Sequence, residues 1–494
     1  MPREPHRLIS TPAAARLRRL GLALLPLALA ACASTPAYQP PAMELPAAFG
    51  EAGLWQPANG ADSTPVPDAW WRLFDDPALD ALQDQVAVGN QTLQQSLAQY
   101  RAAQAALATS RAGLYPTLGL GLDASRSASS RSGTGSSTGS NSGAAATSYS
   151  LSGSASWEVD LWGRLAGQVD TAQARLQASR DDLAAAELSV RATLVQTYLS
   201  LRTAEAQNAL LQDTLAAYQR SLELTRNRYQ GGVASAADVA QAQNQLKSTE
   251  AQLIESQSSR AQLAHALAVL VGKPPGLFSL AETGALPTPP APPVQLPSQL
   301  LERRPDIAAA ERRVAAANAQ VGVARTAFFP ALTLSAGAGY RGSSLGNLVS
   351  APNLFWSIGP ALALTLFDGG QRQAAVASAR ADLDQASASY RQTVLTALQE
   401  VEDNLVIAAS LQREDAVQAE ALAAARRSLE VNTNQYRAGT VSYLNVVTAQ
   451  TAVLSAERSL LDVRNRRLVA VGQLLKNIAG RWDLPPPPAR LDGA

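Results

Sequence analysis

Cysteine and histidine, which serve most often as nucleophiles, general bases and zinc ligands, are almost absent from this chain. Its 494 residues include one cysteine, Cys32, and two histidines, His6 and His265. One cysteine cannot form an intramolecular disulfide, and two histidines leave few possible zinc sites or nucleophile–base pairs. We therefore expect no catalytic residues, no metal and no cofactor, and we interpret the chain as something other than an enzyme.

Cys32 is the one residue placed for covalent chemistry. A region with five arginines precedes an apolar run from Leu20 to Ala31, and the run ends in Leu-Ala-Ala-Cys. The run is too short to span a bilayer as a helix and is typical of a signal peptide. Its end resembles a bacterial lipobox, in which the cysteine takes a diacylglycerol and becomes the new N-terminus. Ala33 follows instead of aspartate, which by the usual sorting rule implies the outer membrane. The alternative is an ordinary signal cleaved nearby, with Cys32 incidental.

Three other motifs have simple structural explanations. Gly337–Gly342 fits G-x-G-x-x-G, but a nucleotide site needs a helix to begin there, and small residues in a strand explain the motif better. Arg303–Asp306 could be an anion site; we favour a helix start, with Pro305 near the first position and the aspartate facing the helix dipole. His265 lies in a region of heptad spacing, so we expect it to pack between helices.

Proline-rich stretches divide the chain. We expect a signal peptide at 1–31, a lipidated N-terminus and extended leader at 32–68, a first repeat at 69–286, a linker at 287–297, a second repeat at 298–482 and a tail at 483–494. The repeats share their order of motifs. Residues 229–239 match 436–446 at an offset of 207, and 111–116 match 325–330 at an offset of 214. The chain therefore contains an internal duplication.

Each repeat is expected to form a helix, two strands, a long helix, a tight turn and a helix. Leucines recur every seven residues, which predicts left-handed coiled-coil packing; the unbroken series is Val447, Leu454, Leu461, Leu468 and Leu475, and the series Leu194, Leu201, Leu215 and Leu222 has Asn208 as its polar exception. The segment 165–228 has no proline, so one helix of about 95 Å is expected.

Four segments alternate apolar with small or polar residues, as lipid-facing barrel strands do; they are 116–125, 147–159, 330–340 and 355–367. The Ser/Gly-rich stretch at 126–148 is expected to be a flexible loop. Four strands cannot close a barrel, and open edges do not survive in lipid. Three chains would supply twelve strands, so we predict a trimer.

The two tight turns share glycine and capping residues. Gly231, Gly232 and Gly439 can adopt positive φ and end the incoming helix, and Ser235 and Ser442 can cap the outgoing one. An aspartate three residues after Ser235, Asp238, predicts a capping box.

Several longer stretches are specific enough to identify a family. They are Leu300–Ile307, Ala310–Arg312, Phe328–Pro330, Trp70–Leu79, Asp160–Arg164, Leu366–Gly370 and the two Tyr-x-x-Gly turns. Together they resemble the TolC/OprM family of outer-membrane efflux proteins, in its NodT-type lipoprotein branch. The resemblance implies a mainly α fold: long coiled-coil helices form a periplasmic α-barrel, and four transmembrane strands per chain close as a twelve-stranded β-barrel in a homotrimer.

The same resemblance implies the function and its sites. The trimer would be the passive exit duct of a tripartite pump for drugs, solvents or metals, with a periplasmic adaptor and an inner-membrane transporter, commonly of the resistance-nodulation-division type, as partners. The implied pore constriction lies at Asp238, Asn445 and Thr448. We predict that the adaptor docks on the two turns, at Gly231, Gly232, Val233, Ser235, Gly439, Thr440, Val441 and Ser442.

Two other functions stay open at this point. One is the exit duct of a type I protein secretion system, and the other is a structural coiled-coil lipoprotein that spaces the envelope. The four strand segments count against the spacer, which needs no barrel. Nucleic acid is not an expected partner, because 41 basic residues are balanced by 40 acidic ones.

Lipidation of Cys32 is directly testable. Cys32→Ser should abolish labelling by a fatty-acid analogue, because the chain has no other thiol to acylate. Undiminished labelling of the variant would contradict the lipobox interpretation. Activity is the weaker measurement, since the barrel can insert without the anchor.

Overall fold

The computed structural model describes residues 38–44, 46, 49–50, 69–128, 145–290 and 304–478. The predicted signal peptide, Cys32, most of the Ser/Gly-rich stretch, part of the linker and the tail lie outside the described residues. No described helix is both long enough and apolar enough to cross a membrane.

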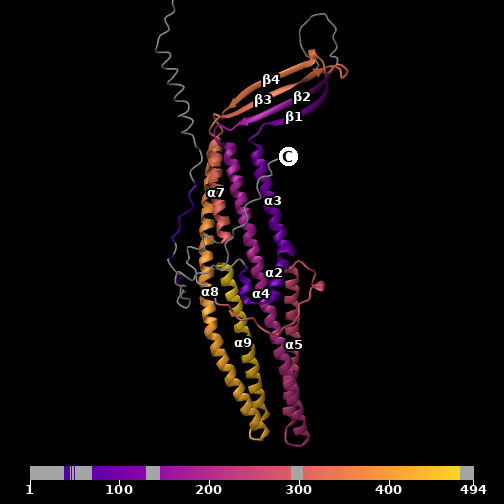
Figure 1. The fold of residues 1–494 in the computed structure, drawn as a ribbon, viewed down its shortest axis with the longest axis vertical. Helices are drawn as coiled ribbons and strands as arrows, with labels where there is room; N and C mark the ends of the chain where they lie inside the picture. The colour runs from indigo at the N-terminus through magenta and orange to yellow at the C-terminus, as the bar shows by residue number, and fades with distance from the viewer. Residues whose placement is uncertain are drawn as a thin grey trace, which may run out of the picture. The chain divides into compact units, whose positions relative to one another are not determined.

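The same order of elements occurs twice, which confirms the predicted duplication (Figure 1). A short segment precedes it, with η2 (Trp70–Phe74) and α2 (Pro77–Gly89). The first repeat has α3 (Gln91–Ala112), β1 (Thr117–Ser127), β2 (Ala146–Val159), α4 (Arg164–Gln230) and α5 (Ala236–Leu270). After η3 (Pro275–Leu277), the second has α7 (Pro305–Thr326), β3 (Ala331–Gly342), η4 (Ala351–Asn353), β4 (Leu354–Ala363), α8 (Gln371–Arg437) and α9 (Tyr443–Ile478). The long helices α4 and α8 have 67 residues each, or about 100 Å.

The chain divides into two compact units. Unit 1 contains the four strands with 102–177 and 311–388, and unit 2 contains the helical hairpins with 42–101, 178–310 and 389–494.

The sheet of unit 1 is antiparallel, in the order β1-β2-β3-β4. Period-two alternation located all four strands. The fourth was predicted to reach Phe367 but ends at Ala363. The reason is its neighbour: Ala363 pairs with Ala331, the first residue of β3, and the backbone beyond has no strand to pair with in this sheet.

The register gives the sheet two distinct faces. Leu120 lies opposite Gly153, Gly153 opposite Ala338, and Ala338 opposite Trp356, and paired residues point to the same side. One face therefore carries Leu118, Leu120, Leu122, Leu151, Trp157, Leu332, Leu334, Tyr340, Leu354, Trp356, Ile358 and Leu362. The other carries mainly serine, threonine, glycine and alanine. The G-x-G-x-x-G motif lies in β3, as expected of small strand residues.

Two tryptophans of unit 1 donate to backbone carbonyl oxygens in the connections that precede β1 and β3. The Trp157 indole donates to the Leu114 carbonyl oxygen at 2.9 Å, and the Trp162 indole donates to that of Pro330 at 2.7 Å. Trp162 also stacks on Phe329, with ring centroids 4.9 Å apart. The Asp-Leu-Trp-Gly-Arg motif thus fixes the turn from β2 into α4.

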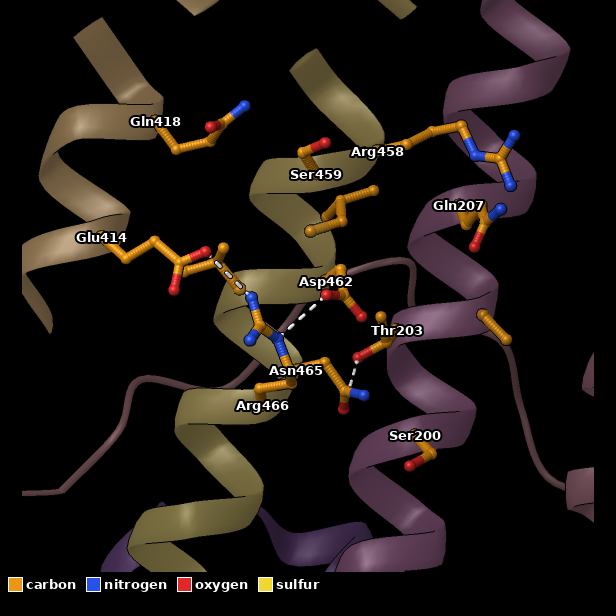
Figure 2. A pocket seen from close by; sticks show the side chains of 13 residues that line it. Ser200, Thr203, Gln207, Glu414, Gln418, Arg458, Ser459, Asp462, Asn465 and Arg466 are labelled. Atoms are coloured by element: carbon orange, nitrogen blue, oxygen red, sulfur yellow. Dashed lines mark hydrogen bonds and ion pairs between the residues drawn. The ribbon is translucent and has the colours of Figure 1, made fainter. Parts of the chain in front are cut away.

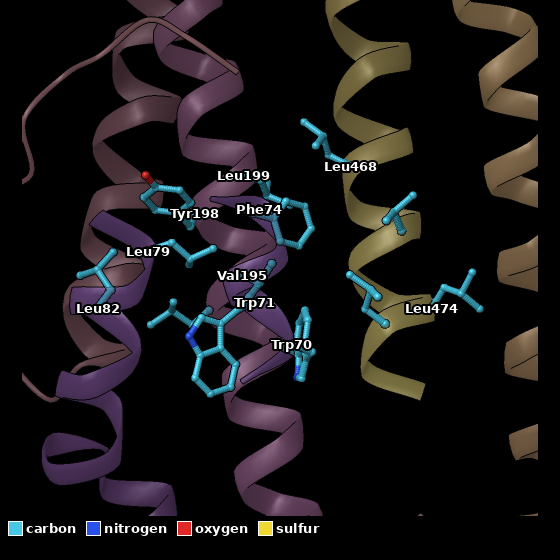
Figure 3. Packing of buried hydrophobic residues seen from close by; sticks show 14 of the residues in the cluster. Trp70, Trp71, Phe74, Leu79, Leu82, Val195, Tyr198, Leu199, Leu468 and Leu474 are labelled. Atoms are coloured by element: carbon cyan, nitrogen blue, oxygen red, sulfur yellow. The ribbon is translucent and has the colours of Figure 1, made fainter. Parts of the chain in front are cut away.

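Unit 2 is built around a core of aromatic and leucine side chains (Figure 3). Trp70 and Phe74 of η2 are buried against α4 and α9, and Leu194, Leu201 and Leu468 of the heptad series are fully buried. The polar exception is also buried: Asn208 is 8% exposed. The heptad spacing therefore located the packed face of the long helices correctly.

A buried ionic network crosses this core. Arg202 and Glu205 of α4 form a 2.7 Å ion pair at 2% and 1% side-chain exposure, and Arg202 also donates to the Ala281 carbonyl oxygen at 2.8 Å. The Tyr198 hydroxyl donates to Asp76, the N-cap of α2. Burial, and next the Asp76 carboxylate, raise the pKa of Tyr198 well above its usual value. The network joins α4 to α2 and to the segment after η3.

The start of α7 agrees with the helix interpretation of Arg303–Asp306. Pro305 is its first residue, and Arg304 forms ion pairs with Asp306 at 2.7 Å and Glu400 at 2.8 Å. Burial alone would raise the pKa of Asp306, but the Arg304 hydrogen bond and charge hold it below its usual value.

The prediction for His265 was wrong. This side chain is exposed on α5 instead of packed between helices of the chain.

The ionic network should be important for stability. Glu205→Gln leaves the buried Arg202 without its counter-charge, so we expect the free energy of unfolding to fall by about 3 kcal/mol. The matched control is Glu250→Gln, which removes an exposed pair with Lys247 and should cost less than about 1 kcal/mol. Thermal denaturation of both variants is the measurement. Equal midpoints would contradict a structural role for the network.

Candidate functional site

The turn between α4 and α5 ends its helix with a Schellman motif. Gly232 has φ +74°, its amide donates to Tyr229 O at 2.9 Å, and the Val233 amide donates to Arg228 O at 2.8 Å. Gly232 provides the positive φ, whereas Gly231 does not adopt it. The expectation that both glycines end the helix therefore holds for Gly232 alone.

The turn between α8 and α9 repeats this geometry 207 residues later. Gly439 has φ +78°, its amide donates to Tyr436 O at 3.0 Å, and the Thr440 amide donates to Gln435 O at 3.0 Å. The repeat thus extends from the sequence to the hydrogen bonds. By the same offset Thr440 is the counterpart of Val233.

The predicted capping box is present at the start of α5. The Ser235 side chain accepts from the Asp238 amide at 3.1 Å, and the Asp238 carboxylate accepts from the Ser235 amide at 2.8 Å and hydroxyl at 2.9 Å. Asp238 is half-buried, and its carboxylate is already hydrogen-bonded within the turn. At the start of α9, the Asn445 amide donates to the Ser442 carbonyl oxygen at 3.2 Å.

The two hairpin ends pack against each other within unit 2 (Figure 1). Tyr436 and Tyr443 lie at the centre of a small apolar cluster, with ring centroids 5.3 Å apart. The Arg228 guanidinium covers the Tyr436 ring at 4.6 Å, and Ser221 hydrogen-bonds the Tyr443 hydroxyl at 3.1 Å. Burial raises the pKa of the Tyr443 hydroxyl above its usual value. The hairpins therefore present their turns together.

The turns differ in which residues they expose. Val233 is 68% exposed, and Thr440 is also exposed. Val441, which we predicted among the docking residues, is half-buried against the Tyr436–Tyr443 cluster. Its counterpart by the 207-residue offset is Ala234, which is half-buried as well. The exposed pair is thus Val233 with Thr440 instead of Val233 with Val441, and Val441 belongs to the packing.

The expected constriction residues are close to these turns. Asn445 and Thr448 are exposed and three residues apart on α9, so they share a face of the helix. Thr448 donates to the Leu444 carbonyl oxygen at 2.9 Å. A role in a pore stays a prediction for all three residues.

A polar groove in unit 2 was not predicted (Figure 2). It measures about 630 Å³ and lies over α9 between α4 and α8. Arg466 binds Glu414 at 3.0 Å and Asp462 at 2.9 Å inside it, and the Thr203 hydroxyl donates to Asn465 at 3.1 Å. Arg466–Asp462 lies within α9, but Arg466–Glu414 and Thr203–Asn465 join different helices, so no local sequence pattern indicates the groove.

Known proteins match nearly the whole chain. The family profile described as "Outer membrane efflux protein" matches residues 82–273 and 296–480. The toluene efflux pump outer membrane protein TtgC of Pseudomonas putida is 30% identical over 467 residues, which cover 94% of this chain and 95% of that protein. The cation efflux system protein CusC of Escherichia coli is 30% identical over 462 residues, covering 92% and 97%. The open-state structure of the Neisseria gonorrhoeae MtrE channel matches with a TM-score of 0.78 at 27% identity, covering 91% and 98%.

The turn geometry predicts different effects for adjacent glycines. Gly232→Ala puts a side chain at φ +74°, which costs about 1–2 kcal/mol, so the turn should open more often. Gly231→Ala is the matched control, because its added Cβ lies 3.6 Å from the nearest atom, Asn227 O. Hydrogen exchange of the Val233 amide should be faster only in Gly232→Ala. Equal exchange in the two variants would contradict the Schellman assignment.

Proposed function

The chain belongs to the outer membrane efflux protein family and is the outer-membrane channel of a tripartite pump, and from this premise we propose how it is assembled and connected. Members of this family are channels, and the chain lies in the outer membrane and extends into the periplasm. In the proposal three copies form one passive duct, Cys32 carries a lipid anchor, and the turns bind a periplasmic adaptor that connects an inner-membrane transporter of the resistance-nodulation-division type.

The sheet carries the proposal of a trimer. β1 and β4 each have one neighbour in the sheet of the chain, so each leaves one edge of backbone donors and acceptors without a strand. The four strands alternate in direction, so β4 of one copy can pair antiparallel with β1 of the next. Three copies give twelve strands, the apolar face turns to lipid and the polar face to a wet lumen.

The polar face supports passive transport of many cargoes. Its side chains are mostly hydroxyls and small groups, which offer no shaped pocket for one molecule. The names of the relatives point the same way, since one concerns toluene and the other cations. We propose that the transporter selects the cargo and that this duct accepts what the transporter delivers.

Asp238, Asn445 and Thr448 are proposed to line the periplasmic constriction. Asn445 and Thr448 are uncharged, and the Asp238 carboxylate already accepts two hydrogen bonds from Ser235. A ring built from these residues would attract cations less than a ring of free carboxylates. The constriction is thus proposed to narrow the duct more by size than by charge.

The adaptor is proposed to dock on the outer surface of the two turns. Both turns have the same backbone geometry, and both expose the residue after the left-handed glycine, Val233 or Thr440. Three copies would present six nearly equivalent turns at the periplasmic end. The small residues around them leave backbone that a partner's hairpin can approach closely.

Bulky residues at the two exposed positions should block export. The double variant Val233→Trp/Thr440→Trp should keep a normal level of outer-membrane trimer but lose most pump-dependent resistance in a strain without other exit ducts. Val233→Thr is the matched control, because the second turn already has threonine there, and it should behave as wild type. Normal resistance of the tryptophan variant, at a normal trimer level, would argue against docking at the turns.

A further inference from the structure

Charged residues are rare on the polar face of the sheet. Within the described strands this face carries Asp123 on β1, Glu158 on β2 and Arg341 on β3. Its other residues are small or hydroxylic, apart from Phe355 on β4. A charge that faces a wet lumen acts on every ion that passes, so these three residues are candidates for setting selectivity.

Glu158 is neutralised within its own chain. The Arg164 guanidinium, at the start of α4, binds both carboxylate oxygens of Glu158, with Nε at 2.8 Å and Nη2 at 2.6 Å. A bidentate pair of this kind has little net field beyond its immediate surroundings. The helix end of the polar face is therefore close to neutral.

Asp123 and Arg341 form a different arrangement near the loop end of the strands. Asp123 lies opposite Ser150, and Ser150 lies opposite Arg341, so the two charges share one row across the sheet. They are two strands apart, about 10 Å, which is too far for an ion pair. Both side chains are exposed, and neither makes an ion pair with a residue in the described part of the chain.

Phe355 supports the arginine. The Arg341 guanidinium lies 5.3 Å from the centre of the Phe355 ring. A planar cation held on an aromatic face keeps its N–H edge available, and that edge is suited to carboxylates and phosphates. Arg341 is therefore an oriented cation, not a freely moving one.

From these observations we infer that Asp123 and Arg341 of three copies form an exit ring, a belt of alternating charge near the outer end of the lumen that sets its ion selectivity. The inference rests on the proposed trimer. Arg341 contacts anionic groups of the cargo, such as carboxylates and phosphates, and Asp123 contacts ammonium groups. Because the charges balance, the intact ring passes cargo of either sign. Removal of Arg341 leaves the Asp123 carboxylates and makes this end selective for cations, and removal of Asp123 makes it selective for anions.

Ion permeability of the reconstituted channel in a planar bilayer tests the exit ring. The side facing the strand loops is held at about 10 mM KCl, where the screening length is about 30 Å, and the other side at about 0.1 M, where it is about 10 Å. Charges at the dilute end then dominate the reversal potential. We expect Arg341→Gln to raise the K⁺/Cl⁻ permeability ratio about twofold or more, and Asp123→Asn to lower it by a similar factor.

Two matched variants make the measurement specific. Arg341→Lys keeps the charge and should keep the wild-type ratio, and the double variant Asp123→Asn/Arg341→Gln should return close to it. Reversing the salt gradient should reduce both single-variant shifts, because the ring is then screened.

Each other outcome overturns the inference. An unchanged ratio in both single variants, or equal shifts with either gradient, would show that these residues do not set selectivity at the outer end. A wild-type chain that forms no channel at all would overturn the proposed duct, and the exit ring with it. Trimer level in detergent, measured for every variant, separates these two failures.

Discussion

The two outer strands of the four-stranded sheet each carry a row of backbone donors and acceptors that must find partners. Inside hydrocarbon there is no water to bond an unpaired N–H or C=O group, and each such group costs several kcal/mol. β1 and β4 leave one edge each. The apolar face runs without a break from Leu120 to Trp356, so the sheet is built for lipid on that side. Closure with further copies satisfies both conditions, and it explains why the duplication supplies an even number of strands.

The two helical hairpins follow from the same duplication. Two long helices of equal length leave the sheet, and each ends in the same left-handed glycine turn, at Gly232 and Gly439. The two halves then differ in the side chains around their turns. The first turn has a capping box that uses Asp238, while the second contributes Tyr436 and Tyr443 to the cluster that holds the hairpins together. Two hairpins with the same backbone and different side chains suit a ring in which the first and second hairpins of each copy alternate as nearly equivalent units.

Most of the fold could be predicted from the sequence because its signals are local and periodic. Alternation located the strands, heptads located the packed helix faces, and glycine with a cap located the turns. The errors arose where contacts between distant parts of the chain determine the exposure of a side chain or the length of a strand. Val441 looked exposed beside a turn but packs on the tyrosines, His265 looked packed but is exposed, and β4 ends where its partner begins. The network of Tyr198, Arg202 and Asp76 joins distant parts of the chain, so no local pattern indicated it.

Disulfide trapping between β1 and β4 of neighbouring copies tests the closure of the sheet most directly. Gly121→Cys would be combined in turn with Ser357→Cys, Gly359→Cys and Ala361→Cys, which lie on the same polar face and sample successive registers. Gly121→Cys with Ser335→Cys on β3 is the control, because the strand β2 lies between these positions within the sheet. Closure predicts a covalent trimer on oxidation for at least one β1–β4 pair and none for the control. Monomer alone in all pairs, from a channel that still exports, would contradict the account.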